Sequence, residues 1–523
     1  MLSFFRQRTR ITLQSSTWRR VSLCRVPTQR NAFRSTPGRR PDESGRGRQE
    51  CPRHVGSRSQ REVILARCLS VCLLFGAGVY AAEPADLIVS ARYVMTMDGK
   101  ALVLENGAVA VRGERIVAID SKVNIDKQFT AKQRIDSGNA ILAPGLINTH
   151  THAPMSLFRG IADDIVLQDW LTKYIFPAEA KNVNPDFVRW GTKLGVLEML
   201  LSGTTTYTDM YYFEELIAEE TKKAGMRGVL GQTVIGFPVS DAKTPAESLA
   251  RTEAFFKKYE GDSLIVPAVA PHALYTNSDD TLKACRALAN KYNRPLLIHL
   301  SETKKENEDI YAKRGMSPTR VLNSLGVFDG RTIAAHGVWL DTGDLTIIKN
   351  KDVGLAHCPS SNMKLASGIA PVVKILSMGI AMGLGPDGPA GSNNDFNLFE
   401  EIDLAAKLQK VAEMDPQALP AKAAVEMATI TGARVLGLEK EIGSIEKGKR
   451  ADMITVSLDA PHATPLYNVY SQFAYALKGS DVRDVVINGK VVVRDRKALN
   501  MDQAAILKMA AEYGVKVQKS LQH

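Results

Sequence analysis

The sequence predicts an α/β protein: a (β/α)8 TIM barrel joined to a small β-sandwich domain that segments from both ends of the body (residues 83–523) build. Three observations predict this class. β-rich runs alternate with helical patterns over residues 144–435, which is the order of a parallel barrel. Short strand-like segments precede and follow that region. Most histidines of the body come directly after a β-rich run, where barrels place reactive side chains.

The β-sandwich domain is predicted from two stretches, residues 83–143 and 436–500. Short runs of β-branched and apolar residues bounded by turn residues are typical of strands. Asn488-Gly489 is a strong signal for a tight hairpin. The expected strands are 87–89, 93–96, 107–111 and 115–119 in the first stretch, and 452–456, 482–487 and 490–493 in the second. Residues 501–523 are expected to form a C-terminal helix.

The barrel is predicted over residues 144–435 from eight β-rich runs. They are the run ending at His150 and the runs 204–210, 227–235, 264–270, 295–300, 332–335, 353–356 and 380–385. Helical patterns lie between them, for example at 188–201, 214–224, 278–292 and 371–377. Eight such units in roughly 290 residues fit a closed barrel. A doubly wound sheet is the alternative.

Charge and cysteine content argue against nucleic acid as a partner and against a disulfide framework. The net charge of +11 comes from residues 1–82, which hold 16 Arg, no Lys and four acidic residues, so the remainder carries −1. No basic patch is left to bind a polyanion. The body contains only two cysteines, Cys285 and Cys358, far apart in sequence. We interpret both as buried apolar residues, although Cys358 adjoins His357.

The first 82 residues are interpreted as two segments. Residues 1–60 are rich in Arg, Ser, Pro and Gly and are expected to be disordered. Residues 61–82 resemble a signal peptide, with a positive flank, an apolar stretch and small residues at its end. The apolar stretch is too short to be a stable membrane anchor. We expect translation to start near residue 61 and the protein to be exported, periplasmic or secreted; an organellar transit signal or a cytoplasmic location is the alternative.

The tripeptide His150-Thr151-His152 is the most informative motif of the chain. Side chains two residues apart on a strand point to the same face, so two neutral nitrogen ligands converge at a strand end, as in half of a zinc site. Other chemically useful residues follow later β-rich runs in the same way. They are His272, His299 with Glu302 three residues on, His336, His357 and Asp387.

These segments resemble the amidohydrolase superfamily from about residue 86 to residue 495. The most similar branch is that of the 5'-methylthioadenosine/S-adenosylhomocysteine deaminases, and triazine chlorohydrolases are near neighbours. The resemblance is carried by residues 144–152, 169–171, 177–179, 271–275, 299–303, 335–337, 357–365, 385–394 and 443–453.

The resemblance implies a metal centre and an acid–base group. His150, His152, His299 and Asp387 match the metal ligands, a set that suits one Zn²⁺, with Fe²⁺ or another divalent metal as the alternative. The fourth barrel strand runs into His272 without a lysine to bridge a second metal. A bound divalent metal activates water to hydroxide. Glu302, His336 and Asp387 match the catalytic positions, with Glu302 as the proton shuttle, and His357 is expected to support them.

For the substrate, the resemblance implies contacts from Glu179, His272, Trp170 and Glu302. The branch also uses an arginine after the third strand, where this chain has Gly231-Gln232, so the specificity for the ribose or for an amino-acid tail is open. We expect a small-molecule partner and hydrolytic release of ammonia from a 6-aminopurine nucleoside: methylthioadenosine, S-adenosylhomocysteine or adenosine. The alternatives are an aminohydrolase or chlorohydrolase acting on a triazine, guanine or pterin, and an inactive barrel that only binds. A homo-oligomer is possible.

Overall fold

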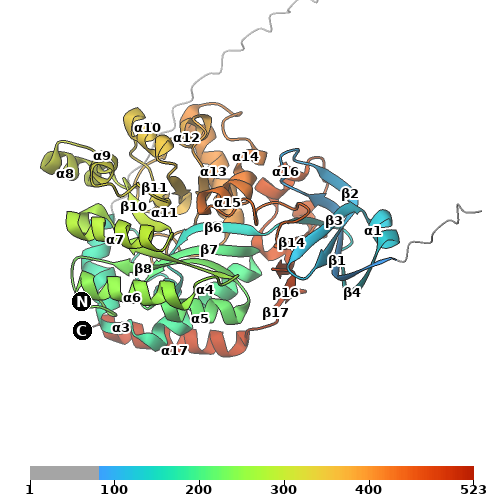
Figure 1. The fold of residues 1–523 in the computed structure, drawn as a ribbon, viewed down its shortest axis with the longest axis horizontal. Helices are drawn as coiled ribbons and strands as arrows, with labels where there is room; N and C mark the ends of the chain where they lie inside the picture. The colour runs from blue at the N-terminus through green and yellow to red at the C-terminus, as the bar shows by residue number, and fades with distance from the viewer. Residues whose placement is uncertain (1–81, 523) are drawn as a thin grey trace, which may run out of the picture. The chain divides into compact units, whose positions relative to one another are not determined.

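The computed structural model describes residues 82–522 (Figure 1). The expected disordered extension 1–60 and the signal-like segment 61–82, apart from Ala82, lie outside the described residues. Within residues 82–522, no helix has the length and apolar character needed to cross a bilayer.

Eight parallel strands close into the predicted barrel, in the cyclic order β6-β7-β8-β9-β10-β11-β12-β13. All eight β-rich runs of the sequence are barrel strands, so this part of the prediction is confirmed. Nearly every residue in these strands is buried, because helices cover the outside and side chains fill the inside. The strands are β6 (Leu146–Thr151), β7 (Thr204–Tyr211), β8 (Arg227–Val234), β9 (Ile265–Pro271), β10 (Leu296–Leu300), β11 (Thr332–His336), β12 (Gly354–His357) and β13 (Met382–Leu384).

The covering helices begin and end at residues with strong capping preferences. The helix expected at 188–201 begins three residues earlier, because Asn184 caps the N–H groups of Asp186 and Phe187 and Pro185 fits the first turn. Gly225 and Gly315 end two others in the left-handed conformation. The main helices are α4 (Pro185–Leu201), α5 (Glu214–Ala224), α6 (Pro245–Lys258), α7 (Asp279–Lys291), α8 (Lys304–Arg314), α9 (Pro318–Ser324), α10 (Thr342–Asn350), α12 (Val372–Ser377), α13 (Leu398–Glu413) and α15 (Ile430–Leu436).

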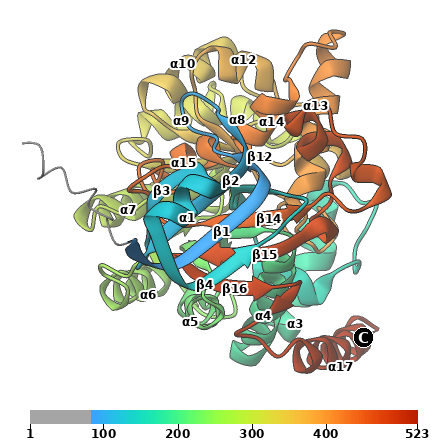
Figure 2. The same ribbon diagram turned by 90° about the vertical axis from the view of Figure 1, so that its right-hand side faces the viewer.

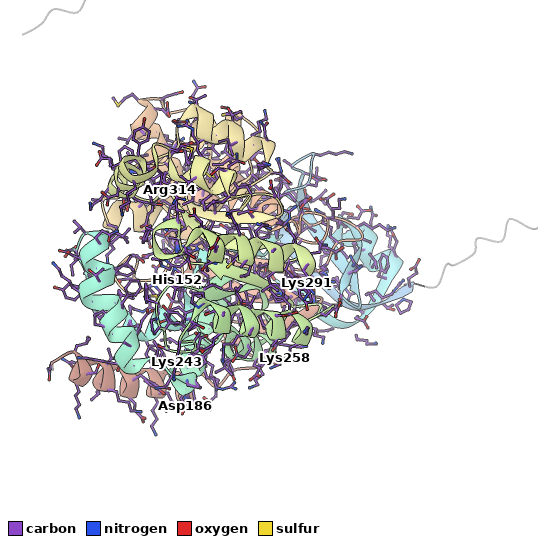
Figure 3. The ribbon with its side chains drawn as sticks, turned by 60° about the vertical axis from the view of Figure 1, so that its left-hand side comes forward. His152, Asp186, Lys243, Lys258, Lys291 and Arg314 are labelled. Carbon is purple, nitrogen blue, oxygen red and sulfur yellow. The ribbon has the colours of Figure 1, made fainter. Side chains whose placement is uncertain are left out.

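Ion pairs join successive covering helices; Figure 3 labels their basic members, Lys258, Lys291 and Arg314. Lys258 of α6 lies 2.8 Å from Glu219 of α5, Lys291 of α7 lies 2.8 Å from Glu253 of α6, and Arg314 of α8 lies 2.7 Å from Asp279 of α7. Such exposed pairs stabilise a fold by only about 0–1 kcal/mol each. Each of them pairs a basic side chain with a carboxylate of the preceding helix.

A helical excursion follows β6 before the chain enters α4. It contains η1 (Ala153–Phe158), α2 (Leu167–Asp169), the π-helical turn η2 (Trp170–Ile175) and α3 (Phe176–Asn182). The C-terminal helix α17 (Gln503–Leu521) packs against α3 and α4 (Figure 1), where Asn182 donates a hydrogen bond to Ser520 at 2.8 Å. The excursion therefore lies between the barrel and the end of the chain.

The β domain is a single hydrogen-bonded sheet of nine strands that takes segments from both ends of the body, as predicted. Figure 2 shows β1, early in the sequence, close to β14 and β15, which come late. The junction is β5, which pairs in parallel with β1 and antiparallel with β14. The strands are β1 (Glu83–Met95), β2 (Val103–Arg112), β3 (Arg115–Ser121), β4 (Phe129–Asp136), β5 (Ala140–Pro144), β14 (Met453–Ser457), β15 (Val482–Ile487), β16 (Lys490–Arg494) and β17 (Lys497–Ala498).

Two details of this sheet bear on the expectations. Asn488 and Gly489, with φ of 48° and 72°, form the hairpin turn between β15 and β16, as expected for this dipeptide. The runs 87–89 and 93–96 were expected as separate strands, but β1 runs through both up to Met95. Ser90 does not interrupt it, because this stretch of β1 is paired on both sides, by β2 and β4.

Candidate active site

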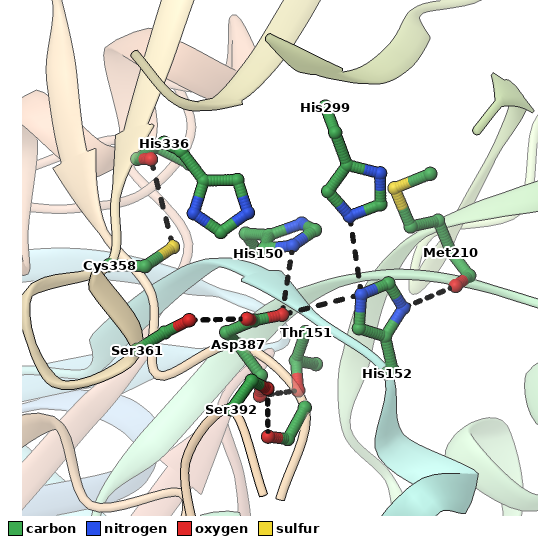
Figure 4. A network of polar contacts seen from close by, with 12 residues as sticks. His150, Thr151, His152, Met210, His299, His336, Cys358, Ser361, Asp387 and Ser392 are labelled. Carbon is green, nitrogen blue, oxygen red and sulfur yellow. Dashed lines mark hydrogen bonds and ion pairs between the residues drawn. The ribbon is translucent and has the colours of Figure 1, made fainter. Parts of the chain in front are cut away.

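Three histidines and one aspartate meet at the carboxyl ends of the barrel strands (Figure 4). His150 lies in β6 and His152 directly follows it, His299 lies in β10, and Asp387 follows β13. Asp387 Oδ1 lies 3.2 Å from His150 Nε2 and 3.3 Å from His152 Nε2, and His299 Nε2 lies 3.4 Å from His152 Nε2. All four residues suggested as metal ligands thus point at one place.

Hydrogen bonds to main-chain carbonyls fix the tautomers of two of these histidines. His152 Nδ1 lies 2.7 Å from the carbonyl oxygen of Met210, and His299 Nδ1 lies 2.8 Å from that of His272. A carbonyl oxygen only accepts, so both Nδ1 atoms carry a hydrogen and each Nε2 is the ring nitrogen left to face a metal ion. The two Nε2 atoms face each other, an arrangement that a cation between them stabilises.

The surroundings also keep ligands in the ionisation states that bind metals. Burial lowers the pKa of His150 to about 4 and that of His299 well below its usual value, so both are neutral at pH 7. Burial alone would raise the pKa of Asp387, but His150 and His152 hold it well below its usual range. Within residues 82–522, His150 Nε2 has no polar partner besides its 3.2 Å contact with Asp387 Oδ1. Burial alone would lower the pKa of His152, but Asp387 raises it to about 9, so a metal ion has to displace one proton from this ring. After that exchange, three neutral nitrogens and a carboxylate fit a divalent metal ion.

Glu302 and His336 stand beside this cluster. Glu302 Oε2 lies 3.8 Å from His336 Nε2, and His336 Nδ1 lies 3.1 Å from Asn362 Oδ1. Glu302 is only 5% exposed, and this burial raises the pKa of its carboxyl group. A carboxyl group with a raised pKa exchanges protons more readily near neutral pH, as a proton shuttle requires.

The backbone is strained where these side chains leave the strands. Ser301, His336 and Asp387 have φ of 49°, 72° and 64°, in the left-handed region that costs non-glycine residues about 1–3 kcal/mol. Glu306 holds the first of these turns, because its carboxylate accepts hydrogen bonds from the N–H of Ser301 at 3.2 Å and of Glu302 at 2.7 Å. The strain is therefore balanced by buried hydrogen bonds that orient Glu302.

Sequence reasoning missed the residues that support the cluster. Glu306 lies in the first turn of α8, four residues after Glu302, and that spacing was its only signal. Ser361 donates a hydrogen bond to Asp387 Oδ2 at 2.7 Å, and Asn362 contacts His336. Both belong to segment 357–365, which carries the family resemblance, but the sequence analysis predicted no role for Ser361 or Asn362. Asp209, at the end of β7, accepts a hydrogen bond from the N–H of Ala153 at 2.5 Å and so holds the turn after His152.

A cavity opens over the cluster, and apolar and aromatic side chains with a few polar groups line it, as is typical of small-molecule sites. The helical excursion after β6 forms one wall, in which Trp170 donates a hydrogen bond to the carbonyl of Ala390 at 2.9 Å. The expected substrate-contacting residues all line this cavity: Trp170, Glu179, His272 and Glu302.

Glu179, in α3, is a buried carboxyl group in the lining of this cavity. It accepts hydrogen bonds from Tyr211 at 2.7 Å and Tyr212 at 3.4 Å. Burial raises its pKa to about 7, although both tyrosines act to lower it. The two hydroxyls orient the carboxylate, which retains further lone pairs for hydrogen-bond donors in the cavity.

Some suggested residues lie elsewhere. Gln232 points away from the cavity, donating to Asp241 at 2.8 Å, and Gly231 packs against Leu297 and Ala270; Thr233 is the residue of β8 that lines the cavity. Gly231 and Gln232 therefore do not decide substrate specificity by direct contact, and the residues that decide it have to be sought among those that line the cavity. His357 is buried but lines no part of this cavity, and its ring nitrogens have no hydrogen-bond partner within residues 82–522.

The cysteines take no part in the cluster. Cys285 and Cys358 are both free and buried, and burial raises the pKa of each thiol. A thiol kept protonated in this way is a poor nucleophile and a poor metal ligand.

A closed barrel whose strand ends gather histidines, an aspartate and a buried glutamate is the architecture of a metal-assisted hydrolase. Comparison with protein families matches residues 141–492 to the amidohydrolase family. The chain belongs to that family.

Individual relatives match over almost their whole length. The chain is 46% identical over 435 residues to a 5-methylthioadenosine/S-adenosylhomocysteine deaminase of Thermodesulfovibrio yellowstonii, covering 83% of this chain and 99% of that protein. It is 44% identical over 439 residues to deaminase 1 of the same kind from Syntrophus aciditrophicus, covering 84% and 99%.

Solved structures give the same fold. An adenosine deaminase from Xanthomonas campestris with bound zinc superposes with a TM-score of 0.82 at 38% identity, covering 84% of this chain and all of that one. A triazine hydrolase variant superposes with a TM-score of 0.76 at 23% identity, covering 82% of this chain and 99% of that one, which shows the shared fold alone.

The cluster predicts that His299→Ala loses the metal. The purified protein is expected to hold about one equivalent of divalent metal by elemental analysis, and a chelator is expected to lower its Tm, because an ion that binds only the folded state stabilises it. His299→Ala is expected to fall far below one equivalent after dialysis. His462→Ala is the control, since His462 is exposed and paired with Asp481. Full metal content in His299→Ala would contradict this ligand set.

Proposed function

We propose that the protein is a zinc-dependent hydrolase of carbon–nitrogen bonds that releases ammonia from a 6-aminopurine nucleoside: methylthioadenosine, S-adenosylhomocysteine or adenosine. One observation carries the proposal. A single cavity is lined by His152, His299 and Asp387 of the ligand cluster, by the buried acid Glu302 and by the buried carboxyl group of Glu179. The names of the relatives described above, at 44% and 46% identity, support the same chemistry.

Zinc is the proposed metal, with Fe²⁺ as the alternative, because three imidazoles and one carboxylate form a mixed nitrogen and oxygen set. When bound, the metal lowers the pKa of a water molecule and supplies a nucleophile at neutral pH. The zinc in the Xanthomonas campestris structure supports this assignment.

The residues of the chain move the protons. The reaction adds water to the ring carbon that bears the amino group, and the ring nitrogen beside that carbon gains a proton. Glu302 gives its proton to the ring nitrogen, and its carboxylate then receives one proton from the added water and passes it to the amino group, which leaves as ammonia. The second proton of the water returns to Glu302 as the C=O bond forms, which restores the acid. His336 is held by Asn362 with Nε2 toward Glu302, so it accepts a hydrogen bond from the attacking water. Asp387, with Ser361 on its other oxygen, provides a second acceptor.

The same cavity holds the sugar. The carboxylate of Glu179, oriented by Tyr211 and Tyr212, accepts hydrogen bonds from ribose hydroxyls. The apolar face of Trp170 and the ring of His272 border the base. Burial lowers the pKa of His272 to about 3, so it contacts the substrate as a neutral ring.

The direct test is ammonia release from a panel of substrates by the zinc-loaded protein. Methylthioadenosine, S-adenosylhomocysteine and adenosine are the nucleosides, and guanine, a pterin and a triazine are the comparison. We expect at least one nucleoside to be converted to the 6-oxo product with kcat/KM in the ordinary enzyme range, above about 10⁴ M⁻¹s⁻¹. Turnover of the heterocycles but of no nucleoside would overturn the proposal.

Replacing the proton shuttle tests the role of Glu302. Glu302→Gln keeps the size of the side chain but removes its exchangeable proton, so kcat is expected to fall by about 10²–10⁴-fold while the metal content stays the same. The control is Glu308→Gln in α8, the helix that follows Glu302; the Glu308 side chain is 63% exposed and pairs with Lys304 at 3.3 Å. A Glu302→Gln enzyme within tenfold of the parent would exclude this residue as the shuttle.

A further inference from the structure

A second cavity adjoins the active-site cavity. The two share three lining residues, Phe176, Glu179 and Tyr212, so these side chains form the passage between them. Beyond the passage, the second cavity, of about 750 Å³, is bounded by α3 and by the loop after β8, through Ala180, Phe237, Pro238, Val239 and Ser240. The ring of Phe237 lies 5.3 Å from that of Phe176, which continues the apolar wall outward.

The passage lies where the 5' end of a bound nucleoside would emerge. The amino-bearing ring carbon has to reach the ligand cluster and Glu302, and the ribose hydroxyls have to reach Glu179. The 5' carbon is attached to the ribose, so its substituent leaves the first cavity beside Glu179 and enters the second.

Within residues 82–522, neither cavity has a lysine or arginine among its lining residues. The charged group at the passage is the carboxyl group of Glu179, which repels a second carboxylate. Lys181 follows Ala180 and Lys243 lies three residues after Ser240, but neither is among the lining residues, and Lys181 donates a hydrogen bond to the carbonyl of Ser520 at 2.9 Å. A carboxylate at the 5' end of the substrate therefore meets no counter-ion among the lining residues, and moving it out of water is unfavourable.

Apolar 5' groups, in contrast to charged ones, are expected to bind favourably in the second cavity. The polarizable sulfur and methyl group of a methylthio substituent pack well against aromatic rings such as Phe176 and Phe237. We propose, on the basis of the proposed function, that the enzyme is selective for adenine nucleosides with a small uncharged 5' group, and that it discriminates against those that carry an amino-acid tail. Phe237 and its loop are the specificity-determining part of the site.

The first test compares kcat/KM for methylthioadenosine and S-adenosylhomocysteine on the zinc-loaded protein. We expect methylthioadenosine to be preferred by about 10- to 100-fold, the range that one unfavourable contact produces. Equal values for the two nucleosides, or a preference for S-adenosylhomocysteine, would overturn the selectivity while leaving the proposed function intact. A protein that deaminates none of the nucleosides would instead overturn the proposed function itself.

The second test supplies the missing cation. Phe237 is 37% exposed, so Phe237→Arg places a guanidinium at the second cavity without opening the core. We expect the preference for methylthioadenosine to fall by about tenfold, mainly through a lower KM for S-adenosylhomocysteine. Tyr467→Arg, at a position that is 91% exposed and lines neither cavity, adds the same charge and is expected to leave the preference unchanged. An unchanged preference in Phe237→Arg would show that the tail does not occupy this cavity.

Discussion

The convergence of imidazole Nε2 atoms on one carboxylate is the interaction on which the site depends. Carbonyl oxygens of Met210 and His272 place hydrogens of His152 and His299 on Nδ1, which leaves their Nε2 atoms facing each other at 3.4 Å. A bound cation takes the place of the proton that Asp387 otherwise holds on His152, whose pKa this carboxylate raises to about 9. Closure of the barrel makes the arrangement possible, because it brings the ends of β6, β10 and β13 around one axis.

The rest of the molecule supports this cluster in layers. Left-handed residues at Ser301 and Asp387 depart from regular strand geometry, and buried acceptors such as Glu306 hold those turns in place. The excursion after β6 covers the cluster and supplies Trp170 and Glu179. In the nine-stranded sheet, β5 pairs with β14, so the segments that precede and follow the barrel in the sequence are joined in one sheet.

Much of this architecture could be predicted from the sequence, because strand ends are visible as the points where apolar runs stop. The eight runs and the histidines that end them follow from local pattern alone. Contacts made across the barrel could not be predicted in this way: Asn362 and Ser361 act on His336 and Asp387, which belong to other strands. Alternation along β8 explains why Gln232 points away from the cavity while Thr233 lines it. The second cavity depends on packing between α3 and a loop distant in sequence, for which the sequence has no local signal.

The central claim is that one metal ion lies among His150, His152, His299 and Asp387. Crystal diffraction recorded on both sides of the zinc absorption edge tests it most directly, because the anomalous difference locates the element as well as the position. The account predicts a single zinc peak about 2.0–2.2 Å from the three Nε2 atoms and one oxygen of Asp387. A peak bound by other residues, two peaks in the cavity, or crystals of zinc-saturated protein without a peak would contradict it.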